Sequence, residues 1–174
     1  ERGVKLGADI PYCIMRGTAL SEGIGEKLTR LPSMPQCQVL IAKPGISVST
    51  KTVYEMLDAR TLRPEDHPDI DGMVEAIRKR DLYEVAGRFG NVLELVTAGR
   101  YPVIGQIEEL MKEYGAINAM MSGSGPTVFG LFSNPSSARK AYEALRYGEG
   151  IDLAKQVYLT NFYNMNQGAA GRLR

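Results

Sequence analysis

Residues 117–132 read Ile-Asn-Ala-Met-Met-Ser-Gly-Ser-Gly-Pro-Thr-Val-Phe-Gly-Leu-Phe. Two short apolar runs, 117–121 and 127–132, flank a segment of serine, glycine and proline. Those three residue types favour turns, and apolar runs of this length favour buried strands. The stretch therefore predicts a β-hairpin. Its two strands are the second and third of the four that the chain predicts from residue 37 onward.

The segments on either side of this hairpin extend the pattern. The apolar run 37–43 stops at Pro44-Gly45 and predicts another buried strand. Residues 156–163 are rich in valine, tyrosine, leucine and threonine, which predicts a last strand. Apolar residues at helical spacing predict helices over 52–59, 73–77 and 82–96, and helices that begin at Pro102 and Pro135.

From residue 37 onward the elements follow the order β-α-β-β-α-β. This is the order of a ferredoxin-like fold, with extra helices in the first crossover. We therefore expect an α+β domain in which helices cover one face of an antiparallel sheet.

The beginning of the chain has a different pattern. Residues 12–19 are apolar with a glycine interruption, and residues 20–30 carry two glycines among polar residues, which predicts a strand, a bend and a second strand. We expect two units, residues 1–33 and residues 34–174. Because the chain opens on Glu1 and runs directly into a dense motif, we also expect it to be part of a longer protein.

The composition excludes several classes of function. The 174 residues include 21 Lys plus Arg and 20 Asp plus Glu, a net charge of +1, which argues against partners such as nucleic acid or an anionic membrane. Cys13, Cys37 and His67 have no metal-ligand spacing, so we expect no metal site. Two lone cysteines fit a reducing compartment, the cytoplasm, and Cys13 is expected in the core because its neighbours form an apolar strand pattern.

Residues 6–11, Leu-Gly-Ala-Asp-Ile-Pro, place a carboxylate in an unusual setting. Gly7 allows close backbone approach, and Pro11 pushes Ile10 toward an extended conformation, so Asp9 is expected on a tight turn. A carboxylate fixed there could accept the proton of a substrate hydroxyl during phosphoryl transfer. The alternative is that Asp9 only caps the following turn, and the hexapeptide by itself favours that interpretation.

Two further loops could bind an anion or a polar substrate. In Ser122 to Pro126 the glycines expose backbone N–H groups, which can form a nest for phosphate, but the segment by itself favours a plain, flexible hairpin turn. No lysine follows as in a Walker loop. Residues 43–52 run from a strand end to a helix start, and their hydroxyl groups could bind a substrate or simply cap the helix.

Taken together and in this order, the three segments resemble the motifs of the GHMP kinase family. Residues 6–11 resemble the segment with the family's catalytic aspartate, and residues 121–130 resemble its third, glycine-rich motif. Residues 17–19, 22–26 and 43–50 resemble a branch of the family that phosphorylates a cytidine diphosphate-linked methylerythritol on the non-mevalonate route to isoprenoids.

The resemblance covers nearly the whole chain and implies a fold and a reaction. Residues 34–174 would be the ferredoxin-like C-terminal domain, and residues 1–33 the end of the N-terminal ATP-binding domain with its connecting hairpin. The complete enzyme would transfer the γ-phosphate of ATP, with Mg²⁺, to the 2-hydroxyl of the substrate. The family's ATP loop and catalytic lysine belong to the N-terminal domain, so the 174-residue chain alone is expected to be inactive.

The resemblance also implies roles for single residues. Asp9 matches the catalytic base, Thr50 matches a substrate contact, and Tyr54 matches an aromatic that stacks on cytosine, although Tyr54 could equally be a core residue of its helix. The loop that closes over the reacting centre matches Ser122, Gly123, Ser124 and Gly125.

Two alternatives remain open from the sequence. The chain could come from another GHMP kinase, acting on homoserine, mevalonate or a phosphorylated relative. It could also be a ferredoxin-like regulatory module that binds a small molecule, although such a module has no use for a fixed Asp9. The sequence leaves the oligomeric state open.

Overall fold

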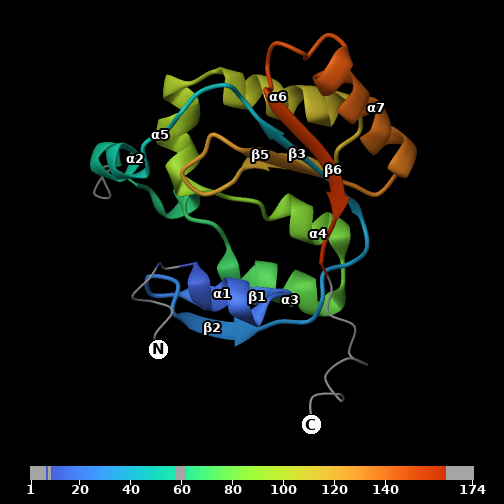
Figure 1. The fold of residues 1–174 in the computed structure, drawn as a ribbon. Coiled ribbons are helices and arrows are strands. Elements are labelled where there is room, and N and C mark those ends of the chain that lie inside the picture. Colours follow the sequence, from blue (N-terminus) through green and yellow to red (C-terminus); the bar gives the residue numbers. More distant parts are fainter. Residues whose placement is uncertain (1–6, 8, 58–61, 164–174) are drawn as a thin grey trace.

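The structure, a computed structural model, describes residues 7, 9–57 and 62–163 (Figure 1). Its main sheet has four antiparallel strands in the order β4-β5-β3-β6. In chain order these are β3 (Gln38–Lys43), β4 (Asn118–Met121), β5 (Val128–Phe132) and β6 (Gln156–Asn161). This is the predicted ferredoxin-like topology, and the hairpin of β4 and β5 is confirmed.

The helices of this domain lie in the two crossovers. The second crossover holds α7 (Pro135–Tyr147). The first holds the six segments α2 (Thr50–Met56), η2 (Pro64–Asp66), α3 (Ile70–Lys79), α4 (Leu82–Gly87), α5 (Val92–Arg100) and α6 (Val103–Glu113). The single helix predicted over 82–96 is two helices, because Asn91 caps a new helix with its side chain on the Leu93 N–H.

Helices cover both faces of the sheet, so the expectation of one covered face is wrong (Figure 1). Leu40 belongs to the larger core with α6 and α7, whereas Val39, next to it on β3, packs with Leu82 and Ala86 of α4. Each large apolar side chain buried in this way contributes about 1.5–3 kcal/mol. Gly130 in β5 lets α6 pack closely, since a Cβ there would lie 2.9 Å from the sulfur of Met111.

The first 33 residues contain a helix that the sequence did not predict. This helix is α1 (Ile10–Met15). After it, β1 (Ala19–Glu22) and β2 (Lys27–Arg30) form a separate two-stranded sheet. The strand predicted over 12–19 is therefore wrong in its first half. Pro11 explains the error, because proline fits the first turn of a helix as well as it fits an extended segment.

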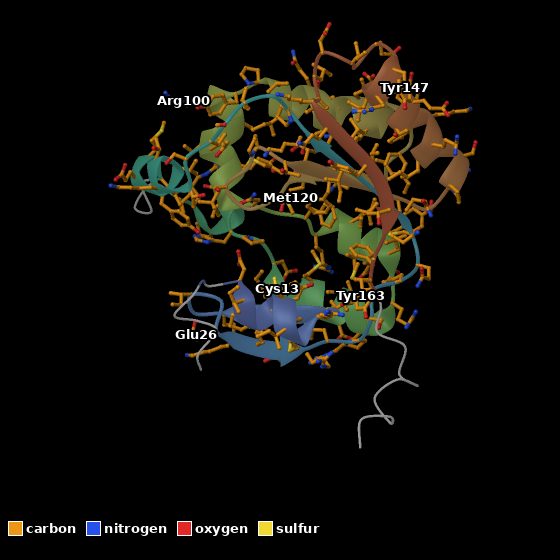
Figure 2. All side chains as sticks on the ribbon, in the orientation of Figure 1. Cys13, Glu26, Arg100, Met120, Tyr147 and Tyr163 are labelled. Carbon is orange, nitrogen blue, oxygen red and sulfur yellow. The ribbon has the colours of Figure 1, made fainter. Side chains whose placement is uncertain are left out.

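The two cysteines differ in environment. Cys13, expected in the core, is exposed on α1. It lines a pocket together with Tyr163, and both are labelled in Figure 2. Cys37 is buried, and burial raises the pKa of its thiol to about 11, so it is not a nucleophile at neutral pH.

None of the helices described here has the length and apolar character needed to cross a membrane.

Candidate active site

The start of α2 and the glycine-rich turn between β4 and β5 meet at one end of the sheet (Figure 1). Ser49 is the N-cap of α2, because its Oγ accepts from the Thr52 N–H at 3.4 Å. Thr50 is therefore the first helical residue, and its Oγ1 lies 2.8 Å from the Oγ of Ser124. The structure thus joins two of the segments that the sequence singled out.

The glycine-rich turn has a defined backbone. The Ser122 N–H donates to the Thr127 carbonyl at 2.8 Å, and the Gly125 N–H donates to the Ser122 carbonyl at 3.0 Å. Gly123 and Gly125 have φ angles of +57° and +83°, which glycine adopts without steric cost. At Gly125 an added Cβ would also collide with the side chain of Met121, so this position requires glycine.

Helix α5 holds the carbonyl groups of the turn. The Nδ2 of Asn91 donates to the Met121 carbonyl at 3.0 Å and to the Gly123 carbonyl at 2.9 Å. One and a half turns further along, the hydroxyl of Thr97 lies 3.4 Å from the Ser124 carbonyl. The carbonyl groups of Met121, Gly123 and Ser124 are therefore directed toward α5, whereas that of Ser122 accepts a hydrogen bond within the turn.

This arrangement leaves two amide groups free to bind a ligand. Because a trans peptide is planar, the N–H that follows the Gly123 carbonyl points away from Asn91. Among the described residues, the N–H groups of Gly123 and Ser124 have no acceptor. Two free N–H groups next to the hydroxyls of Ser122 and Ser124 form a group of donors that suits an anion.

The sequence did not single out the α5 residues that hold the turn. Asn91, Glu94 and Thr97 recur every three residues, which places them on one face of the helix. An asparagine before a run with helical spacing signals an N-cap, and that signal was available for Asn91. The partners of Asn91 lie 30 and 32 residues away, so the clamp itself had no local signal.

Tyr54 lies on α2 one turn after Thr50 and is 61% exposed. It is therefore not part of the core, whereas its neighbour Val53 is 4% exposed and anchors α2. The ring of Tyr54 is free to receive a flat ligand.

Asp9 precedes α1 as its N-cap residue but makes no side-chain hydrogen bond to the helix. The capping interpretation of Asp9 is therefore not supported. Asp9 lines a cleft of about 460 Å³, walled by Thr18 and Ser21 and by apolar side chains of α3, α4 and the sheet. No hydrogen bond or ion pair within the described part of the chain joins Asp9 to Thr50 or to the glycine-rich turn.

The other predicted hydroxyl groups lie in a second, smaller cleft. Ser47, Ser49 and Thr52 line a space of about 210 Å³ between α2 and α5, with Arg100 and Tyr101 on its other side. Of the four predicted hydroxyl groups, that of Thr50 is the one that forms a hydrogen bond to the glycine-rich turn within the described residues. In the segments 9–57 and 62–163, no three His, Cys, Asp or Glu side chains are grouped so as to hold a metal ion.

Comparison with known proteins identifies the fold family. Residues 73–149 match the family model described as GHMP kinases C terminal. The chain is 59% identical over 162 residues to 4-diphosphocytidyl-2-C-methyl-D-erythritol kinase of Lachnospira eligens, a match that covers 92% of this chain and 54% of the relative. The protein of the same name from Lachnoclostridium phytofermentans is 54% identical over 163 residues, with the same two coverages. The chain thus spans about half the length of these curated relatives.

Solved structures show the same architecture. A crystal structure of 4-(cytidine 5'-diphospho)-2C-methyl-D-erythritol kinase superposes with a TM-score of 0.68 at 29% identity, covering 91% of this chain and 54% of that one. Homoserine kinase from Cytophaga hutchinsonii, at 19% identity, superposes with a TM-score of 0.70 over 88% of this chain and 50% of that one and shows the shared fold alone. The family model, the curated relatives and the β4-β5-β3-β6 sheet together show that this chain belongs to the GHMP kinase family and carries its C-terminal domain.

Proposed function

We propose that the complete protein to which this chain belongs transfers the γ-phosphate of ATP to the 2-hydroxyl of 4-diphosphocytidyl-2-C-methyl-D-erythritol. The observation that carries the proposal is the hydrogen bond between Thr50 and Ser124. It brings the residue proposed to contact the substrate against the turn proposed to bind phosphate. The names of the two curated relatives support the choice of substrate.

The glycine-rich turn would bind the phosphoryl group while it is transferred from ATP to the substrate. The free N–H groups of Gly123 and Ser124 and the hydroxyl of Ser122 are donors that can hold the equatorial oxygens as negative charge shifts on them. The backbone of Gly125 keeps the turn closed through its N–H bond to Ser122. Because α5 already fixes the carbonyl groups, little reorganisation is needed when the phosphate arrives.

Asp9 would act as the base in this reaction. Its carboxylate would take the proton of the 2-hydroxyl as that oxygen bonds to the γ-phosphorus, and ADP would leave with the electrons of the broken P–O bond. Thr50 would orient the substrate, and Tyr54 would stack on the cytosine ring. Stacking of a base on an aromatic side chain is worth about 1–3 kcal/mol.

The reaction would use ATP with Mg²⁺, but the described residues offer no protein cluster for the metal. Mg²⁺ is commonly held by nucleotide phosphates with few protein ligands, so we assign it no residue in this chain. The free thiols of Cys13 and Cys37 favour a reducing compartment, and we place the enzyme in the cytoplasm.

We further propose that residues 1–33 are the end of an ATP-binding domain and residues 34–174 a C-terminal domain. The separate two-stranded sheet of β1 and β2 supports this division.

The test uses the protein expressed from its complete coding sequence. Incubation with ATP and Mg²⁺ and each of three alcohols, the cytidine diphosphate ester, homoserine and mevalonate, is followed by ³¹P NMR. We expect a new phosphomonoester signal only with the cytidine diphosphate ester. Phosphorylation of homoserine or mevalonate instead would assign the protein to another member of the family.

A further inference from the structure

Two residues of α5 hold both polar backbone groups of Met121, the residue before the glycine-rich turn. The Nδ2 of Asn91 donates a hydrogen bond to the Met121 carbonyl, and the Oε2 of Glu94 accepts one from the Met121 N–H at 2.9 Å. β4 is the edge strand of the sheet, so this N–H points away from β5, toward the carboxyl groups of Glu94 and Glu108. Glu94 thus fixes the end of β4 from which the turn starts.

Glu108 of α6 lies beside Glu94 in the interior. It is 8% exposed, and its Oε1 has no hydrogen-bond partner among the described residues. Burial first and the charge of Glu94 second raise the pKa of Glu108 to about 7, while burial raises the pKa of Glu94. Glu108 is buried and Glu94 is half-buried, and two neighbouring carboxyl groups in such a setting do not both ionise readily, so they share one proton until the pH rises past about 7.

The surroundings supply little compensation for a second negative charge. Lys112, on the same helix as Glu108, is the positive group that acts on the pair and lowers the pKa of both carboxyls. Strands β4 and β5, on which α6 packs, contain no titratable side chain. The contact from α5 comes from Glu94 itself, which adds negative charge.

We propose that Glu108 is a positioning residue for the glycine-rich turn, which it holds through a proton shared with Glu94. While Glu108 is protonated, its hydroxyl donates to the Glu94 carboxylate and keeps that carboxylate on the Met121 N–H. When the proton leaves, the two carboxylates repel each other, Glu94 withdraws, and the turn loses one of its supports. The effect on turnover rests on the proposed kinase function, whereas the effect on the turn does not.

The decisive measurement is amide hydrogen exchange of residues 119–125 in the protein expressed from its complete coding sequence. Rates at pH 6 and pH 8.5 are converted to protection factors, which removes the intrinsic pH dependence of exchange. We expect protection to fall about tenfold in the wild type, the change that corresponds to the loss of one hydrogen bond to Met121. Glu108→Gln keeps the hydrogen-bond donor without the charge, so its protection should stay the same at both pH values.

The matched control is Glu109→Gln, which alters the exposed neighbour on the same helix and should behave as the wild type. Equal protection at both pH values in the wild type would overturn the proposal, as would a loss in Glu108→Gln equal to that in the wild type. If Glu108→Gln fails to fold, the wild-type comparison still decides. The pH profile of kcat, measured in parallel, should fall above pH 7 in the wild type but not in Glu108→Gln. A protein with no kinase activity would refute the proposed function while leaving the exchange result to stand by itself.

Discussion

The hydroxyl groups of Thr50 and Ser124 lie 2.8 Å apart across 74 residues of sequence. Each is held by a different element: Val53 anchors the helix of Thr50 in the core, and Asn91 at the start of α5 clamps the turn of Ser124. A hydrogen bond between two separately fixed elements has little freedom to move. It therefore sets the distance between the proposed substrate contact and the proposed phosphate site.

Removing the Thr50 hydroxyl should impair catalysis without unfolding the protein. In Thr50→Val, kcat/KM should fall about tenfold, which corresponds to the loss of one hydrogen bond of about 1–1.5 kcal/mol. Thr50→Ser should restore most of the activity, and Thr160→Val, at an exposed position on β6, should have no effect. Steady-state kinetics with a thermal melt of each variant provide the check, and full activity in Thr50→Val would remove Thr50 from the site.

The segments that sequence patterns predicted correctly are those whose structure depends on near neighbours. The turn at 122–126 follows from the glycine and proline within it, and helix α2 follows from the capping residues before it, although its observed start at Thr50 is two residues before the predicted one. The clamp at Asn91 depends on a strand 30 residues away, so no local pattern contained it. Helix α1 was missed for another reason, since Pro11 is compatible with two local conformations.

Asn91 offers a way to separate clamping from capping. In Asn91→Asp the Oδ1 can still cap the Leu93 N–H, but the amide that donates to the Met121 and Gly123 carbonyls is gone. We expect kcat to fall at least tenfold, with a smaller loss of stability than in Asn91→Ala, which also loses a cap worth about 1 kcal/mol. Kinetics and chemical denaturation of both variants test this, and equal kcat in Asn91→Asp and the wild type would contradict it.

Tyr54 should contribute to binding rather than to stability, because its ring is 61% exposed. Tyr54→Ala should raise KM for the cytidine diphosphate substrate by roughly 5- to 150-fold, the equivalent of about 1–3 kcal/mol of stacking. Tyr54→Phe should be close to the wild type, since the ring remains. Tyr158→Ala, at another exposed tyrosine, is the control. An unchanged KM in Tyr54→Ala would show that the cytosine lies elsewhere.

Asp9→Asn keeps the shape of the side chain but removes its basicity. If Asp9 is the base, kcat should fall by about 10²–10⁴, the usual contribution of general base catalysis, while KM changes little. Asp71→Asn, on the first turn of α3, should leave both constants unchanged. Turnover at the wild-type rate in Asp9→Asn would exclude Asp9 from proton transfer.

The buried pair of Glu94 and Glu108 predicts how stability depends on pH. The pKa of Glu108 is about 7 in the folded protein and near its ordinary value of 4.5 in the unfolded chain, so between these values the folded state binds more protons. Stability should therefore be highest below about pH 4.5 for this group and fall as pH rises toward 7. The raised pKa of Glu94 acts in the same direction.

Urea denaturation at pH 5 and pH 8 should then show an unfolding free energy lower at pH 8 by about 1–2 kcal/mol, after allowance for solvent screening. Glu108→Gln cannot ionise and should flatten most of this dependence, whereas Glu109→Gln should not. The carboxyl groups with lowered pKa values, Glu26 and Asp66, affect stability only at more acidic pH, so they do not mask the effect. Parallel pH curves for the wild type and Glu108→Gln would show that Glu108 is already ionised in the folded protein. In that case the shared proton, and with it the pH-dependent support of the glycine-rich turn, would not exist.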